Sequence, residues 1–440
     1  MKRILFLILI ILASCEKPPI DSDEIIIDYN PKIELNVLQS NLSIPTSVIE
    51  YSLLRESIDW QHGNFYYVSG GNEYLLIPGA GTERKGNPIL FKKQNNSWTF
   101  HKIYNDVEME GVRQGYWIND SRFIIADAAE CYSQSCLDEF GIVRDGSYLW
   151  VVDIVGDDLS FQKIPKDGYH HDVSFGDLDN DGDLDYVSTG AGIVYQTSNG
   201  FNIDSESLPP SWGNIFFAVE IVDLDGDGYS EIIQASYVDS EPLVHGFRVL
   251  KRNNNEQYDI VYESTETKHQ TYNGMYGANW IRAKDINSDG LYDLLIQREG
   301  NGISENTMEI YFGKSDGTFT SKQLITNNGN IKWLTAELLD VDVDGDLDIV
   351  FGAHGGGSGL RLGSRYEDGF RLENLIYIND GFGNFERISN ELVSTSSYTF
   401  NKFIPYMNKN NELTFWGGLV ESYTASESSV YISEVIIKNL

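Results

Sequence analysis

The sequence predicts an all-β protein built from short antiparallel strands and hairpins. A nine-residue acidic segment occurs four times, and each copy runs directly into a short stretch rich in β-branched residues, such as DYVS or DIVFG. Similar strand-like stretches precede the first copy. Apolar residues make up 41% of the 440 residues, with 26 Tyr, 21 Phe and 8 Trp, which is enough for a large core.

The four acidic segments, called the acidic loops below, share five constrained positions. They are DLDNDGDLD from Asp177, DLDGDGYSE from Asp223, DINSDGLYD from Asp285 and DVDVDGDLD from Asp340. Each has Asp at position 1, Asp or Asn at 3, Asp at 5, Gly at 6 and Asp or Glu at 9. So much negative charge in a folding segment repels itself unless a cation offsets it.

This spacing predicts a calcium site in each loop. Ca²⁺ takes about six to eight oxygen ligands, and Gly at position 6 supplies the positive φ that lets the side chains converge. Position 7 varies, as expected where the backbone carbonyl is the ligand. The predicted ligand residues are Asp177, Asp179, Asp181, Asp183, Asp185, Asp223, Asp225, Asp227, Tyr229, Glu231, Asp285, Asn287, Asp289, Leu291, Asp293, Asp340, Asp342, Asp344, Asp346 and Asp348.

Three other interpretations of the loops exist. An EF-hand needs Glu at position 12, where this chain has Ser188, Gln234, Ile296 and Phe351. Mg²⁺ is disfavoured because several carboxylates in each loop suit a larger and more flexible shell. Acidic surface turns without a metal are the remaining alternative.

The loops resemble the FG-GAP, or VCBS-type, repeats of integrin α-subunits and bacterial surface proteins. A companion signature stands in YINDGFGNFERIS (377–389), YFGKSDGTFTSKQL (311–324) and VYQTSNGFNI (194–203). The resemblance implies a β-propeller with four-stranded antiparallel blades and about four Ca²⁺ ions in the hairpins between strands 1 and 2. Outside the loops it extends only to the rhythm of the strands, and it implies no reaction.

The strand rhythm predicts seven blades within residues 46–440. Two blades precede the loops, at about 50–105 and 110–165, and four carry the loops. The seventh has a degenerate loop from Tyr406 to Thr414, in which Asn411 replaces the glycine, because Asn tolerates positive φ. Six or eight blades are the alternatives. Whether a strand from 31–40 closes the ring stays open.

The N-terminus predicts export and a lipid anchor. Lys2 and Arg3 precede an apolar stretch that is too short to span a bilayer, and LASC resembles the lipobox of bacterial lipoproteins, whose cysteine is acylated. We therefore expect a signal peptide at 1–15, lipidation of Cys15, a tether at 16–45, and a location at the outer membrane or cell surface. A plain signal peptide is the alternative.

The net charge limits the possible binding partners, and the two remaining cysteines bear on the redox state of the compartment. The formal net charge of −34 argues against binding nucleic acid through a basic face. Cys131 and Cys136 form an even pair in a chain expected to be exported, which favours a disulfide. Two free thiols are the alternative.

Aromatic residues stand where the chain enters strand 1 of five blades, on the face opposite the acidic loops. Such a ring suits the flat faces of sugars, although several members would serve equally well as packing between blades. The candidates are Tyr169, Trp212, Tyr272, Tyr276, Trp280, Trp333 and Tyr398. The resulting hypothesis is a calcium-binding, lipid-anchored module of the cell envelope that binds a glycan or a protein.

An enzyme is the second hypothesis. His171, Tyr276 and Arg361 could form a polysaccharide lyase site, and two carboxylates could serve a glycosidase. The chain has no Ser-His-Asp signature, HExxH or P-loop. His171 serves equally well as a hydrogen-bonding residue of the ring, and a purely structural role is the third hypothesis.

Overall fold

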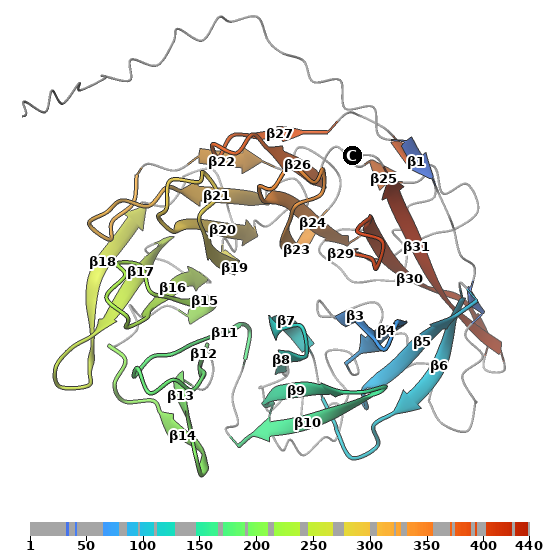
Figure 1. The fold of residues 1–440 in the computed structure, drawn as a ribbon, viewed down its shortest axis with the longest axis horizontal. Helices are drawn as coiled ribbons and strands as arrows, with labels where there is room; N and C mark the ends of the chain where they lie inside the picture. The colour runs from blue at the N-terminus through green and yellow to red at the C-terminus, as the bar shows by residue number, and fades with distance from the viewer. Residues whose placement is uncertain are drawn as a thin grey trace, which may run out of the picture.

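The computed structural model shows a ring of small sheets (Figure 1). It describes residues 32–34, 40–41, 65–78, 86–95, 97–109, 112–127, 147–165, 170–189, 192–209, 215–237, 245–266, 277–299, 306–320, 323–326, 332–354, 370–371, 375–388, 392–393, 402–424 and 427–438. Among these residues no helix is long and apolar enough to cross a membrane.

Seven antiparallel blades form a β-propeller, as predicted; blades 1 to 5 are separate four-stranded sheets, whereas blades 6 and 7 belong to one nine-stranded sheet. Blade 1 consists of β3 (Phe65–Ser69), β4 (Asn72–Ile77), β5 (Ile89–Gln94) and β6 (Ser97–Ile103). Blade 2 consists of β7 (Val112–Asn119), β8 (Arg122–Asp127), β9 (Leu149–Val155) and β10 (Asp158–Ile164). Blade 3 consists of β11 (Val173–Gly176), β12 (Asp185–Ser188), β13 (Gly192–Thr197) and β14 (Gly200–Asp204).

Blades 4 to 6 carry the other three acidic loops. Blade 4 consists of β15 (Ile215–Val222), β16 (Glu231–Tyr237), β17 (His245–Arg252) and β18 (Tyr258–Glu266). Blade 5 consists of β19 (Gly277–Lys284), β20 (Asp293–Glu299), β21 (Thr307–Tyr311) and β22 (Gln323–Thr326). Blade 6 consists of β23 (Lys332–Leu339), β24 (Asp348–His354), β26 (Ile376–Asn379) and β27 (Phe385–Arg387), with a separate pair β25 (Phe370–Arg371) and β28 (Leu392–Val393).

The seventh blade joins the two ends of the chain. It consists of β29 (Lys402–Met407), β30 (Leu413–Thr424) and β31 (Glu427–Lys438), and its outer edge is formed by β1 (Lys32–Glu34) and β2 (Ser40–Asn41), which both pair with β31. Figure 1 shows β1 beside β31. Residues 32–34 and 40–41, which were predicted to lie within the tether at 16–45, thus form strands of the propeller.

Hydrophobic clusters fill the spaces between neighbouring blades. Blades 1 and 7 share one such cluster, in which Phe91 and Trp98 lie with Ile404 and Trp416. The inward side of each strand supplies these residues, because side chains alternate between the two faces of a sheet. Each fully buried large apolar side chain contributes roughly 1.5–3 kcal/mol, so the contact between the first and last blades stabilises the closed ring.

A buried polar cluster, called the closure cluster, accompanies this apolar contact. The carboxylate of Glu434 in β31 is fully buried, and it accepts hydrogen bonds from Trp98 Nε1 at 3.1 Å, Tyr406 Oη at 2.7 Å and Lys93 Nζ at 2.7 Å. Lys93 and Trp98 belong to blade 1, whereas Tyr406 belongs to blade 7. One carboxylate thus connects the two blades that close the ring.

Candidate metal loops and central channel

The four acidic loops lie between the first and second strands of blades 3 to 6, as predicted. In each loop the position 1 carboxylate accepts backbone N–H bonds from within the loop. Asp177, for example, accepts from Asn180 N at 2.6 Å and Gly182 N at 3.0 Å. The side chain thus folds the backbone around itself and leaves the carboxylates of the other positions close together.

The backbone conformation agrees with the role predicted for glycine. The position 6 glycines all have positive φ: Gly182 89°, Gly228 90°, Gly290 85° and Gly345 101°. Asn411 of the degenerate loop also has positive φ, at 63°. Position 4 needs the same conformation, which the sequence analysis missed. Val343 adopts it at φ 64°, which is strained for a β-branched side chain.

Position 9 fixes the base of each loop. Its carboxylate is almost fully buried and accepts the backbone N–H of position 2, as in the 2.9 Å bond from Leu178 N to Asp185 Oδ2. In three loops the second oxygen accepts a backbone N–H from the third strand or from just beyond its end, namely Gln196 N, Gly313 N or Asn379 N. The carboxylate therefore ties the loop to the blade as well as facing the loop interior.

In three of the loops, three carboxylate oxygens lie within 4.8 Å of one another. The groups are Asp177, Asp179 and Asp185 in the first loop, Asp223, Asp225 and Glu231 in the second, and Asp340, Asp342 and Asp344 in the fourth. In the first and fourth loops buried oxygens lack a hydrogen-bond partner among the described residues, at Asp179 Oδ1 and Asp346 Oδ1. Burial and the neighbouring Asp344 and Asp342 raise the pKa of Asp346 to about 6. Orphaned oxygens and mutual repulsion are what a hard cation would relieve.

The second loop differs from the other three. The Lys251 ammonium, on β17, lies 2.5 Å from Asp225 Oδ2, 2.8 Å from Asp227 Oδ2 and 3.0 Å from Glu231 Oε1. Although burial alone would lower it, these contacts raise the pKa of Lys251 above its ordinary value. The hydrogen bond from Lys251 correspondingly lowers the pKa of Asp227.

The innermost strands of all seven blades line one central channel, with a cavity of about 570 Å³. Its wall carries charged and aromatic side chains together, including Glu220, Trp280, Arg282, Lys284 and Glu337. This volume lies in the usual range of small-ligand sites, about 300–1,000 Å³.

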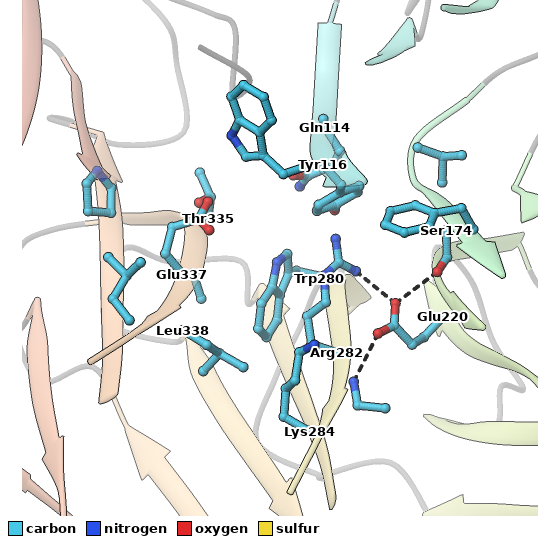
Figure 2. A pocket seen from close by; sticks show the side chains of 18 of the residues that line it. Gln114, Tyr116, Ser174, Glu220, Trp280, Arg282, Lys284, Thr335, Glu337 and Leu338 are labelled. Atoms are coloured by element: carbon cyan, nitrogen blue, oxygen red, sulfur yellow. Dashed lines mark hydrogen bonds and ion pairs between the residues drawn. The ribbon is translucent and has the colours of Figure 1, made fainter. Parts of the chain in front are cut away.

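Arg282 is held by three blades within the channel. Its guanidinium carbon lies 3.5 Å from the centre of the Tyr116 ring, and its Nη1 lies 3.3 Å from Glu220 Oε2. Ser174 Oγ donates to the same Glu220 oxygen at 3.0 Å. Figure 2 shows Arg282 between Tyr116 and Glu220, with Trp280 beside it. Arg282 Nη2 has no hydrogen-bond partner among the described residues.

Asp172 supports this arrangement from behind Tyr116. It is fully buried and accepts Tyr116 Oη at 2.7 Å and Val219 N at 2.9 Å, so it connects blades 2, 3 and 4. Burial raises the pKa of Asp172 to about 7 although Arg282 lowers it. This fixed cluster holds the guanidinium in one position within the channel.

Two charged groups of the channel remain open to water. The side chains of Lys284 and Glu337 are exposed, and neither makes an ion pair with a described residue. Water reaches Glu337 inside the channel, but the surrounding walls desolvate its carboxylate and raise its pKa to about 7, against the lowering effect of Arg282. The channel thus presents the cations Arg282 and Lys284 together with three carboxyl groups, those of Glu220, Asp223 and Glu337, of which that of Glu337 titrates near neutrality.

A family model described as FG-GAP-like repeat matches residues 285–351. This chain carries an FG-GAP-like repeat. The matched segment runs from the first Asp of the third acidic loop into β24, so it contains two of the four loops. No curated protein sequence matches the chain.

Two solved structures are similar to the chain in outline. The Dos1 propeller is 11% identical with a TM-score of 0.42, over 87% of this chain and 95% of that one. The S. cerevisiae core factor is 9% identical with a TM-score of 0.30, over 93% of this chain and 62% of that one. The sheet pairing of the chain itself establishes the seven-bladed architecture.

The aromatic residues that the sequence predicts to bind a ligand do not share one location. Trp333 is buried and stacks on Phe351 of the neighbouring strand of the same blade, with ring centres 3.7 Å apart. Trp280 is nearly buried beside Arg282 and lines the channel. Several other predicted site residues lie outside the residues that the structure describes. These are the aromatic residues Tyr169, Trp212, Tyr272, Tyr276 and Tyr398, together with Arg361, Cys15, Cys131 and Cys136.

His171 lies within the ring, where it stacks on Phe217 with ring centres 3.7 Å apart and an interplanar angle of 10°. Its backbone N–H donates to Thr189 Oγ1 at 2.9 Å. Arg282, Glu220 and Asp172 were not among the predicted site residues. Their only sequence signal is a charged residue inside, or directly before, an inner strand that is otherwise largely apolar.

Proposed function

We propose that this chain is a calcium-stabilised β-propeller that acts as a binding module of the cell envelope, anchored by a lipid on Cys15, and that its ligand is an anionic glycan. The observation that carries the proposal is the central channel. It combines a fixed guanidinium, an exposed ammonium and an aromatic face in a cavity of about 570 Å³.

Calcium supports the fold in this proposal. The oxygens at positions 1, 3, 5 and 9 and the position 7 carbonyl would hold the ion, which would offset the charge of each loop. The orphaned oxygen of Asp179, at position 3 of the first loop, fits this requirement. Because the loops lie between the first two strands of each blade, calcium would stabilise the strands that line the channel.

The chemistry of the channel favours a carboxylated sugar. Arg282 Nη2 and the Lys284 ammonium suit a carboxylate, the indole of Trp280 suits the apolar face of a sugar ring, and Glu337 suits hydroxyl groups. The cavity would admit one or two sugar units. A protein partner would have to insert a single acidic side chain or loop.

Binding of uronic acid oligosaccharides is expected to weaken at least tenfold when Lys284 is replaced, as in Lys284→Gln, because one charge-assisted contact is lost. Lys284 is exposed, so its replacement leaves the fold intact. Lys314→Gln, on an exposed turn of blade 5, is the matched control. Calorimetric titration against acidic and neutral oligosaccharides measures the effect, and equal affinity of wild type and Lys284→Gln would contradict the proposal.

The affinity for an acidic oligosaccharide is expected to rise several-fold as the pH falls from 8 to 6. Glu337, with a pKa raised to about 7, is a carboxylate above that pH and repels an anion, whereas below it the group is neutral. Although burial alone would lower it, the pKa of Arg282 is raised further by the neighbouring Tyr116 and Glu220, so Arg282 stays charged throughout. Asp172 titrates in the same range behind Tyr116. Glu337→Gln separates the two carboxyls, because it abolishes the pH dependence only if Glu337 causes it.

The lipid anchor has its own test. The precursor, expressed in a bacterial host, is expected to partition into the detergent phase with the membrane fraction, because an acyl chain contributes roughly 0.8 kcal/mol per buried CH₂. Cys15→Ser should move the protein into the aqueous phase. A wild-type protein already found in the aqueous phase would refute the anchor and leave the binding proposal untouched.

A further inference from the structure

Lys251 lies where a cation would lie in the second acidic loop. Its ammonium nitrogen lies 2.5–3.0 Å from one carboxylate oxygen each of Asp225, Asp227 and Glu231. These residues occupy positions 3, 5 and 9, three of the positions that would ligate a metal. Ca²⁺–oxygen distances are about 2.3–2.6 Å, so an ion and the ammonium cannot share this space.

The sheet register explains why Lys251 reaches this loop. Leu250 on β17 pairs with Ile232, so Lys251 stands one residue further along, beside Glu231 at position 9. The corresponding residues of the other three loop-bearing blades are Tyr195, Phe312 and Ile378. None of these is a cation.

Position 9 of this loop also differs from the others. It is Glu231, whereas the other loops have Asp, whose second oxygen accepts a backbone N–H from the third strand or from just beyond its end. In this loop the second oxygen of Glu231 instead faces the Lys251 ammonium at 3.0 Å. The longer side chain and the lysine therefore occur together in one blade.

We propose that the Lys251 ammonium replaces the metal of the 223–231 loop, so that the chain takes three calcium ions, not four. This inference rests on the proposed calcium binding of the other loops. The Lys251 ammonium offsets one of the four negative charges of the loop, and it does so by direct, partly buried ion pairs with three of the carboxylates. Blade 4 then keeps its loop folded in the absence of calcium.

The test counts calcium ions bound to the full chain by calorimetric titration of calcium-depleted protein. Wild type is expected to bind three ions. Lys251→Met is expected to bind four, because it frees the three carboxylates and leaves the rest of the loop unchanged. Its melting temperature in excess chelator should fall below that of wild type, and calcium should restore it.

A second pair of variants covers the case in which Lys251→Met does not fold. Asp225→Asn, at position 3 of the 223–231 loop, is expected to leave the number of bound calcium ions at three. Asp342→Asn, the same change in the fourth loop, is expected to lower it to two. A wild-type count of four, or loss of one ion in Asp225→Asn, overturns the role of Lys251. A wild-type count of zero overturns the calcium proposal itself.

Discussion

Removing calcium is expected to lower the melting temperature of the protein steeply. A ligand present at about 100 times its Kd stabilises the folded state by roughly 2.7 kcal/mol per site, so three sites would together contribute about 8 kcal/mol. Without the ion, the carboxylates of the 177–185, 285–293 and 340–348 loops repel one another. Thermal unfolding followed by circular dichroism, with and without excess chelator, measures the change.

Magnesium is the informative control for this experiment. It requires a smaller and nearly octahedral shell with ligands at about 2.0–2.1 Å, which a loop of several carboxylates does not favour. Calcium added back in excess over chelator should restore the melting temperature, whereas an equal excess of magnesium should restore little of it. Recovery that is equal with both ions would show general screening of charge in place of a specific site.

Replacing Glu434 by alanine is expected to destabilise the protein by about 3–5 kcal/mol, the usual cost of removing one partner from a buried charged pair. The substitution leaves the Lys93 ammonium, the Trp98 N–H and the Tyr406 hydroxyl of the closure cluster without their shared acceptor. Because these groups join blades 1 and 7, the ring should open at this contact first. Urea denaturation measures the loss of stability.

Two variants define the origin of this effect. Glu434→Gln keeps one acceptor oxygen for Trp98 and Tyr406 and should therefore lose less stability than alanine. Glu256→Ala removes a carboxylate that is 80% exposed on the β17–β18 turn, and it should change stability by no more than about 0.5 kcal/mol. If Glu434→Ala resembles Glu256→Ala, the closure cluster does not hold the ring.

The repeated loops allowed most of the architecture to be predicted. Their spacing located the first hairpin of four blades, and the positive φ of Gly182 and Asn411 followed from the turn that the spacing requires. The count of seven blades followed from the strand rhythm between and beside the loops. These features are local in the sequence, so periodicity reveals them.

Contacts between blades could not be predicted in the same way. Tyr116, Asp172 and Arg282 come from blades 2, 3 and 5, and only the closed ring brings them together. Trp333 stands at the start of an inner strand, but its stacking on Phe351 depends on which side of the sheet it faces. Strands β1 and β2 are too short to show a clear alternation, which is why their part in blade 7 was left open.

Lys251 illustrates the same limit within a single blade. Its sequence position, twenty residues beyond Glu231, carries no motif, and only the register of β16 and β17 places it beside the loop. A strand alignment of the four loop-bearing blades would have marked it as the one cation among apolar counterparts.

The calcium content of the purified protein tests the central claim most directly. Protein prepared without chelator and dialysed against metal-free buffer is analysed for bound metals by elemental analysis. The claim predicts three calcium ions per chain, with little magnesium. Protein that is folded and stable but contains no calcium would contradict it.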